Sequence, residues 1–375
     1  MRVVLQQVPK LVFGVDALAA AREFVASYAR PLVITSPSNR ATAARFGGVV
    51  DDSTRSEPTV AHFEALLASA QELQPDVIVG LGGGSPLDAA KLVAALCNSS
   101  QTFSEALGIG NLKGRTLPLV CLPTTAGTGS EVSPNAVFLD ESDAMKKAVI
   151  SPFLVPDATF IDPSLMLTVP PAVTAATGLD ALTHCIEAYA NNFSNPLVDT
   201  WALDGIRLIA GVLGTAVREP DNLKARTQVA LGSLYGGLGL GPVNTAAVHA
   251  LSYPLGGRFH IPHGHANAIL LPHVMRFNLP AAPERYATIA LALGAERQGD
   301  HEATALAGIG ALWRLISETC LEMRLSELRI PESEIPSLAA AGLSVTRLMK
   351  NNPRPMTHQD AEEIYRSAFA GRVDG

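Results

Sequence analysis

Up to about residue 160, short unbroken runs of Val, Ile and Leu alternate with Ala-rich stretches of helical length. The apolar runs cover residues 31–36, 75–82 and 117–123, and Ala-rich stretches at 61–73 and 87–96 lie between them. A strand without polar alternation is buried on both faces, which is typical of parallel sheets whose strands are joined by crossover helices. We therefore expect an α/β fold for this half of the chain.

The second half of the chain lacks such strands. Beyond Pro163 the β-branched runs disappear, and long segments rich in Ala and Leu predict an all-helical fold. The expected helices cover residues 172–189, 195–217, 223–238, 246–251 and 302–323. Because proline does not fit inside regular elements, the Pro-rich stretch 157–171 is the expected boundary between domains 1–162 and 163–375.

Charge and composition limit the partners of this chain. The 28 Lys and Arg residues are outnumbered by 35 Asp and Glu residues, and the absence of a dense basic run argues against nucleic-acid binding. Only 17% of the residues are charged and 47% are hydrophobic, so part of the surface is expected to be covered in a homo-oligomer, a dimer or larger.

The cysteines and the apolar segments indicate the compartment. Four cysteines lie far apart without a CxxC pair, which fits a reducing cytoplasm better than a disulfide framework. The N-terminus has polar Gln6 and Gln7 where a secretion signal needs an apolar stretch. The most apolar segments, such as 208–217, are shorter than the ~18 residues of a membrane helix. We therefore expect a cytoplasmic protein with no membrane partner.

A glycine-rich loop follows the strand predicted at 76–81. The loop residues are Gly82, Gly83, Gly84 and Ser85. Ser85 is a candidate N-cap, Pro86 a first helical residue, and Asp88 lies where a capping box has an acid. Backbone N–H groups at such a helix start suit a diphosphate, although a tight capped turn without a ligand would have the same sequence.

A second loop contains Thr124, Thr125 and Thr128 and follows the strand predicted at 117–123. Ligands of open parallel sheets bind beyond the carboxyl ends of the strands, so the two loops could flank one cofactor; an ordinary polar connection is the alternative. Ser36, with Arg40 nearby, ends an earlier strand and favours NADP or dual cofactor use, unless Arg40 is only a surface charge.

Histidines gather in one part of the sequence. Five of the nine lie between residues 249 and 273, and His184 follows Asp180 by four residues on a predicted helix. We expect the helix of His249 to stop at Pro254, and His263 to open the next helix, so that a loop brings both imidazoles together. The proposed ligands are Asp180, His184, His249 and His263. Without thiolates, this set favours a catalytic Fe²⁺ or Zn²⁺.

The remaining histidines receive no ligand role. We expect surface or supporting positions for His260, His265 and His273, and no function for His62, His301 and His358.

Four stretches together resemble the iron-containing (group III) metal-dependent alcohol dehydrogenase family. They are GLGGGSPLDAAK (80–91) and residues 122–138, 162–189 and 248–278. The resemblance spans nearly the whole chain up to about residue 325. It implies a dehydroquinate synthase-like fold with a Rossmann-like dinucleotide-binding domain, a helical metal-binding and substrate domain, and the cofactor and metal in the cleft between them.

The resemblance also assigns residues. By matching position, Asp180, His184, His249 and His263 correspond to the metal ligands. The cofactor contacts correspond to Gly82, Gly83, Gly84, Ser85, Asp88, Thr124, Thr125 and Thr128. Lys147 matches a lysine of the family's pattern.

Two positions depart from the family pattern. Many members have a second histidine one turn after the first, thought to relay a proton, where this chain has Tyr253. Tyr253 still faces the same side as His249, and its phenol can donate and accept a hydrogen bond, but it could equally be packed before Pro254. Ser36 stands where NAD-preferring members often have Asp, which leaves NAD and NADP both open.

The main hypothesis is therefore an NAD(P)-dependent and metal-dependent enzyme that interconverts an alcohol and an aldehyde or ketone. The alternative is a maleylacetate reductase, for whose anionic substrate Arg258 is a candidate partner. A dehydroquinate synthase-type lyase, or a cofactor-binding protein without activity, are further readings of the same architecture.

Overall fold

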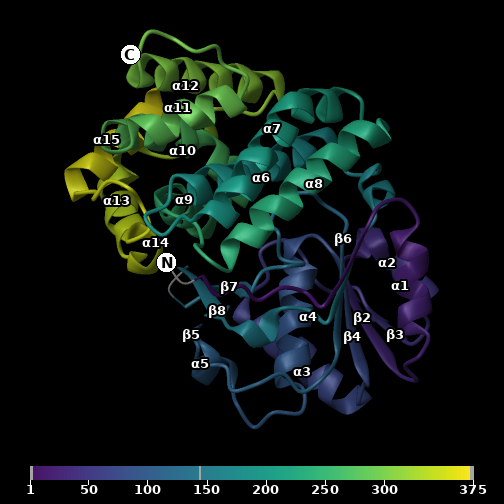
Figure 1. Cartoon of the computed structure of the whole chain (residues 1–375). Coiled ribbons are helices and arrows are strands. Elements are labelled where there is room, and N and C mark those ends of the chain that lie inside the picture. Colours follow the sequence, from purple (N-terminus) through teal and green to yellow (C-terminus); the bar gives the residue numbers. More distant parts are fainter. Residues whose placement is uncertain (1–2, 143–144, 372–375) are drawn as a thin grey trace. The chain divides into compact units, whose positions relative to one another are not determined.

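The computed structural model describes residues 3–142 and 145–371, which form two compact units (Figure 1). One unit spans Val4–Thr168, and the other begins at Val169. The first is built around a sheet and the second consists of helices, as the apolar pattern predicts.

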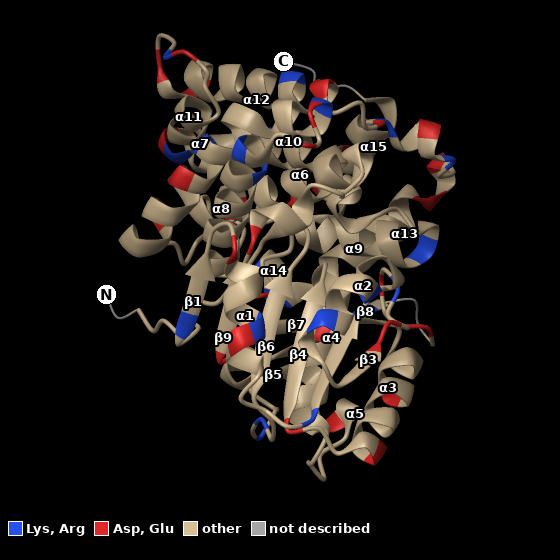
Figure 2. Ribbon diagram, turned by 90° about the vertical axis from the view of Figure 1, so that its right-hand side faces the viewer, with Lys and Arg blue, Asp and Glu red and all other residues tan. Residues whose placement is uncertain are grey.

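A six-stranded, fully parallel sheet forms the centre of the first unit. Its strands, in spatial order, are β1 (Lys10–Phe13), β9 (Ala158–Ile161), β6 (Leu119–Pro123), β4 (Val77–Gly82), β2 (Pro31–Thr35) and β3 (Val49–Asp51). The inner strands β2, β4 and β6 carry no charged residue, and β4 and β6 are drawn without blue or red in Figure 2. The uninterrupted apolar runs of the sequence thus mark the buried strands correctly.

Alternate residues of each strand pack on opposite faces of this sheet. Leu32 and Ile34 of β2 belong to one apolar cluster, whereas Val33 belongs to another. The first cluster also holds residues of α3 (Val60–Leu73) and α4 (Gly84–Leu96), and the second holds residues of α1 (Ala17–Val25). Both faces are therefore covered, which explains why the strands tolerate so few polar residues.

A small second sheet completes this unit and has no counterpart in the sequence prediction. It contains β5 (Gly108–Ile109), parallel to β8 (Met145–Ile150), and β7 (Asn135–Asp140), antiparallel to β8. The remaining short helices of the unit are α2 (Arg40–Ala43) and α5 (Phe103–Ala106).

The second unit is helical throughout its described length. Its helices are α6 (Pro171–Tyr189), α7 (Pro196–Arg218), α8 (Leu223–Leu240), α9 (Ala247–Phe259), α10 (His263–Asn278), α11 (Pro283–Ala292), α12 (His301–Glu318), α13 (Ile335–Leu343), α14 (Thr346–Met349) and α15 (His358–Ala370). The predicted helices 172–189, 195–217, 223–238 and 302–323 correspond to α6, α7, α8 and α12.

The predicted end of α9 is wrong. The helix continues through Pro254 to Phe259, and its C-cap His260 adopts a left-handed conformation with φ 54°. An internal proline costs one backbone hydrogen bond, but Pro254 is buried among apolar side chains of a fully packed helix, and this packing outweighs the lost bond. The connection between α9 and α10 is consequently only residues 260–262.

The start of α10 lies very close to α6. A Cβ atom on Gly264 would stand 2.1 Å from the Ala176 carbonyl oxygen, so only glycine fits there. This close approach brings the first turn of α10, which begins with His263, against the face of α6.

Helix α7 is long and apolar enough to cross a membrane by length and composition, which differs from the prediction that no segment reaches that length. It packs against α6 and α8, and its buried face includes Val198, Ile206 and Leu213. These contacts are those of a core helix in a globular unit.

Candidate metal centre and cofactor loops

Helix α6 presents acidic and imidazole side chains on one face. Pro171 is its first residue, a position where the missing N–H costs nothing. Asp180, His184 and Glu187 follow at intervals of four and three residues, which place them along the same side of a helix. All three are buried, with 2 to 5% of each residue exposed.

Helices α9 and α10 add one imidazole each to this face. Asp180 Oδ1 lies 3.9 Å from His184 Nε2, 3.5 Å from His249 Nε2 and 3.7 Å from His263 Nε2. The rings of His184 and His249 are stacked with centroids 4.7 Å apart. The structure therefore brings all four predicted ligands together.

The spacing and chemistry of these atoms fit a divalent cation. Donors about 2.1 Å from a tetrahedral ion lie roughly 3.4 Å from one another, close to the separations from Asp180 Oδ1. Three imidazole nitrogens with one carboxylate oxygen suit Fe²⁺ or Zn²⁺ and are too few oxygens for Mg²⁺ or Ca²⁺. The His263 side chain is 26% exposed while the other three are 5% or less, so the site is open on the side of His263.

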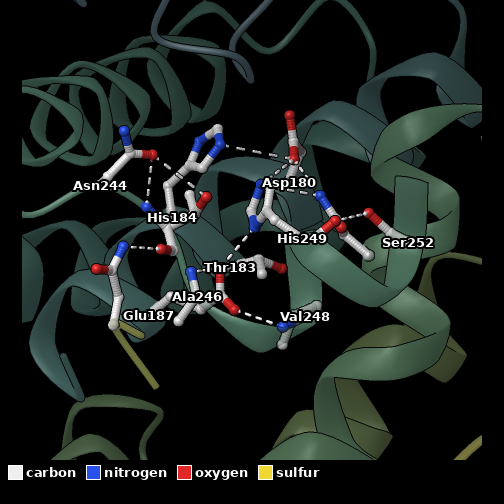
Figure 3. Close-up of polar contacts among 12 residues, drawn as sticks. Asp180, Thr183, His184, Glu187, Asn244, Ala246, Val248, His249 and Ser252 are labelled. Carbon is white, nitrogen blue, oxygen red and sulfur yellow. Dashed lines mark hydrogen bonds and ion pairs between the residues drawn. The ribbon is translucent and has the colours of Figure 1, made fainter. Parts of the chain in front are cut away.

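Glu187 supports this cluster and is absent from the residues predicted above. Its Oε2 lies 2.6 Å from His249 Nδ1, and Figure 3 shows Asp180 and Glu187 at opposite sides of the His249 ring. An imidazole bound to a carboxylate through Nδ1 directs the lone pair of Nε2 toward a metal. The seven-residue spacing from Asp180 on one helix face is the sequence signal that indicates Glu187.

Asn267 is a second residue missing from the prediction. It lies one turn after His263 on α10 and is fully buried. Its amide nitrogen donates to Asp180 Oδ1 over 2.7 Å. The four-residue spacing from His263 is again the usable signal.

The electrostatics of the cluster favour a bound cation. Burial by itself would raise the pKa of Asp180, but His184 and His263 outweigh it and hold that pKa below its ordinary value. Burial would lower the pKa of His249, yet Glu187 and Asp180 raise it to about 10. Asp180 faces His249 Nε2 and would stabilise a metal ion at that atom, whereas Glu187 acts on the opposite nitrogen, Nδ1, and makes the ring a better donor.

The other histidines lie outside the cluster. His260 ends α9 and is exposed, and His265 Nε2 lies 2.6 Å from the Glu322 carbonyl oxygen. His273 is buried against Trp313, with ring centroids 5.8 Å apart. The exposed or partly exposed residues His62, His301 and His358 belong to α3, α12 and α15.

Tyr253 lies beside the open side of the cluster. It is one turn after His249, 7% exposed, with its ring centroid 5.9 Å from that of His263. Arg347 Nη2 donates to Tyr253 Oη over 3.1 Å. Its ring also packs in a buried apolar cluster with Ala250 and Leu348, so Tyr253 is both a packed side chain and a neighbour of the metal-ligand candidates.

The two predicted cofactor loops touch each other in the first unit. Thr124 N donates to the Gly82 carbonyl oxygen over 2.9 Å, at the adjacent ends of β6 and β4. A Cβ atom on Gly84 would stand 2.7 Å from Thr128 Cγ2, so the glycine permits this contact. Ser36, at the end of β2, accepts a hydrogen bond from Asn39, which also donates to Thr124.

The expected capping of α4 is wrong. The helix begins at Gly84 after Gly83, and no side chain caps it, so Ser85 and Pro86 lie inside its first turn. The Asp88 carboxylate accepts hydrogen bonds from Ser130 Oγ and Val137 N. Asp88 therefore ties α4 to the second loop and to β7, because those N–H and O–H donors satisfy its oxygens.

The remaining predicted residues, Arg40, Lys147 and Arg258, lie on other elements, namely α2, β8 and α9. Arg40 forms an ion pair with Asp52 at 2.7 Å on the surface. Lys147 lies on β8, opposite Phe138 in the small sheet. Arg258, the candidate partner of an anionic substrate, donates to Ser337 Oγ over 2.9 Å.

Comparison with known proteins identifies the family. The pattern described as "Iron-containing alcohol dehydrogenase" matches residues 9–163, and that of the C-terminal part of the Fe-containing alcohol dehydrogenase family matches residues 174–369. Long-chain-alcohol dehydrogenase 1 of Geobacillus thermodenitrificans (strain NG80-2) is 39% identical over 321 residues, 84% of this chain and 81% of that protein.

Solved structures agree with this. The crystal structure of a 1,3-propanediol oxidoreductase matches with TM-score 0.95 and 33% identity, covering 98% of this chain and 100% of the other. That of sulfoacetaldehyde reductase from Bifidobacterium kashiwanohense in complex with NAD+ matches with TM-score 0.88 and 26% identity over 99% of this chain and 100% of the other. None of these three proteins is named as a maleylacetate reductase, so the comparisons do not favour that alternative. The chain belongs to the iron-containing alcohol dehydrogenase family and is an oxidoreductase that interconverts alcohols and aldehydes.

Proposed function

We propose that Asp180, His184, His249 and His263 hold the catalytic cation, Fe²⁺ by preference over Zn²⁺, in an alcohol dehydrogenase that uses NAD or NADP. The observation that carries this proposal is the convergence of three imidazole Nε2 atoms within 3.9 Å of Asp180 Oδ1. The family pattern favours iron, and the donor set accepts either ion.

The metal, the cofactor and the four ligand residues have different roles in the proposed reaction. When bound, the cation polarises the substrate oxygen as a Lewis acid, and the nicotinamide supplies or accepts the hydride. The four ligands fix the position at which the substrate oxygen binds, and their burial excludes water from three of the four side chains. His263, the most exposed of them, marks the side from which the substrate enters.

The cofactor is proposed to bind at the carboxyl ends of β2, β4 and β6. The residues involved are Ser36, Gly82, Gly83, Gly84, Ser85, Thr124, Thr125, Thr128 and Lys147, with Asp88 holding the two loops together. The start of α4 offers N–H groups without a side-chain cap, which suits a diphosphate. Ser36 brings no carboxylate to the ribose, so we propose that NADP is accepted as well as NAD.

We further propose that Tyr253 provides a hydrogen bond near the reacting oxygen. Arg347 holds its phenol oxygen in place, and its ring lies beside His263. Tyr253 stands at the position on α9 where family members with the usual pattern have a second histidine.

We propose a cytoplasmic homo-oligomer acting on small alcohols and carbonyl compounds. Cys97, Cys121 and Cys185 are buried free thiols, which fits a reducing compartment. Val4, Leu5 and Leu11, before and within the edge strand β1, are 70%, 36% and 39% exposed, and a second copy of the chain would cover them.

The test is metal analysis combined with a substrate panel. We expect one divalent ion per chain, and reduction of aldehydes that consumes NADH or NADPH. The His263→Ala variant should lose the ion and nearly all turnover while it keeps most of its nicotinamide affinity, because His263 and the glycine loop lie on different elements. Full turnover in metal-free protein, or no net change in nicotinamide absorbance, would contradict the proposal and, in the latter case, favour a lyase.

A further inference from the structure

The side chain of Asn267 lies among three of the four metal-ligand candidates. Its Nδ2 is 2.7 Å from Asp180 Oδ1, 3.1 Å from His249 Nε2 and 3.3 Å from His263 Nε2. These three atoms define one face of the ligand set, and the amide nitrogen covers that face. Asn267 is 0% exposed, so it is a buried part of this cluster.

The contact with Asp180 favours this orientation of the amide. Turning it round would place the amide oxygen 2.7 Å from Asp180 Oδ1, where two acceptors would repel each other. Asn267 Oδ1 instead points to a buried place where it has no hydrogen-bond partner among the described residues. A buried oxygen without a partner costs about 1–3 kcal/mol, so the contacts of Nδ2 must outweigh that cost.

We propose that Asn267 is a positioning residue that orients Asp180 and closes one face of the metal site to solvent. This inference rests on the metal site of the proposed function. The N–H group donated to Asp180 Oδ1 fixes the carboxylate in the plane that faces the three imidazoles. The amide itself excludes water and small anions from the face of Asp180, His249 and His263, which keeps the number of metal ligands low and leaves other faces for the substrate.

Three smaller or charged side chains each fail one of these requirements. Aspartate at this position would face Asp180 with a second negative charge, and alanine would leave Asp180 without its donor and open a space for water. Serine keeps one O–H donor but is too short to cover the face. The three substitutions therefore separate the donor function from the space-filling function.

The test loads wild type, Asn267→Ala and Asn267→Ser with Co²⁺ and measures affinity by chelator competition, together with the visible absorption of the ion. Asn267→Ala should bind Co²⁺ about 10- to 100-fold more weakly. Its visible bands should lose intensity, because added water raises the coordination number, and should respond to azide. Asn267→Ser should recover part of the affinity and still respond to azide.

Asn278→Ala is the matched control. Asn278 lies on the same helix, is 2% exposed, and exchanges two side-chain hydrogen bonds with Asn352. Its loss should lower the thermal stability of the metal-free protein without changing the Co²⁺ spectrum. If Asn267→Ala is insoluble, the Co²⁺ affinity and spectrum of Asn267→Ser are compared with those of wild type instead.

The outcomes separate the two proposals. An Asn267→Ala protein with the wild-type Co²⁺ spectrum and an affinity within about twofold of wild type overturns the role of Asn267 and leaves the metal site standing. Wild-type protein that binds no Co²⁺ overturns the metal site, and this inference with it.

Discussion

The Glu187 carboxylate lies 2.6 Å from His249 Nδ1 and also accepts the backbone N–H groups of Ala246 and Val248, at 3.0 and 2.6 Å. Three N–H donors thus converge on one buried side chain at the start of α9. Only a carboxylate offers acceptors for all of them, and its charge is also favourable at a helix N-terminus. Glu187 therefore fixes both the tautomer of His249 and the beginning of the helix that carries it.

The substitution Glu187→Gln should lower metal affinity about 10- to 100-fold. A glutamine has a single acceptor oxygen, and its amide would face at least one of the three N–H donors with an N–H group of its own. The His249 ring then loses its fixed orientation. Chelator competition with the purified protein measures the change directly.

The matched control is Glu131→Gln in the first unit. Glu131 is also buried, at 4% exposure, and burial raises the pKa of its carboxyl to about 7. Its substitution should leave metal affinity unaltered. Equal metal affinity in Glu187→Gln and wild type would show that His249 needs no carboxylate to orient it.

The contact between the cofactor loops predicts the effect of Gly84→Ala. The added Cβ would stand 2.7 Å from Thr128 Cγ2, so the two loops must separate. We expect a nicotinamide dissociation constant at least about tenfold higher, with metal affinity unchanged, because overpacking of this kind costs about 1–3 kcal/mol. Fluorescence titration with NADH measures it.

A second substitution checks the cause. Thr128→Ser removes the methyl group that the new Cβ meets, so the double variant should recover part of the lost affinity. Gly114→Ala is the control in the same unit, since nothing lies within 4 Å of its Cβ position. Additive losses in the double variant would mean that the Gly84 side chain disturbs something other than Thr128.

Periodicity in the sequence predicts most of the fold. The inner strands are unbroken apolar runs because both faces of the sheet are covered. Their sequences show no alternation of polar and apolar residues that would indicate an exposed face. The helix of Asp180 and His184 is likewise predicted, since a spacing of four residues has meaning only on a helix. The course of α9 through Pro254 is not predicted, because it depends on packing against neighbours distant in sequence.

The ligand set follows from residue types, whereas its supporting residues do not. For Glu187 and Asn267 the sequence offers only a helical spacing from Asp180 and His263, because neither residue type is distinctive alone. Their contacts with His249 and Asp180 become visible only when α6, α9 and α10 are seen side by side. The capping role expected for Asp88 shows the opposite error: the residue lies next to the glycine loop in sequence, but its carboxylate accepts hydrogen bonds from Ser130 and Val137 instead of capping α4. Local spacing cannot show which partners a carboxylate finds across the fold.

The phenol of Tyr253 predicts a measurable effect of Tyr253→Phe. The ring remains beside His263, but the phenol oxygen that accepts from Arg347, and that we propose bonds the substrate, is lost. We expect turnover to fall at least about tenfold while the metal content stays at the wild-type value. Arg347→Met is the companion variant and should show a smaller loss, because it keeps the phenol. Unchanged turnover in Tyr253→Phe would show that Tyr253 only fills space.

Burial of His273 predicts a loss of stability in acid. Burial lowers the pKa of this histidine from 6.5 to about 4, so below pH 6.5 the unfolded chain binds a proton that the folded chain does not. The stability lost between pH 6.5 and pH 4 amounts to about 3 kcal/mol from this group. His273→Phe keeps the ring against Trp313 and removes the titration, so its stability should fall less with pH than that of wild type. Urea unfolding at pH 7 and pH 4.5 measures the difference. The exposed His301→Phe variant is the control, and its stability should change with pH as that of wild type does. If the stability of His273→Phe falls with pH as much as that of wild type, the acid sensitivity comes from another group.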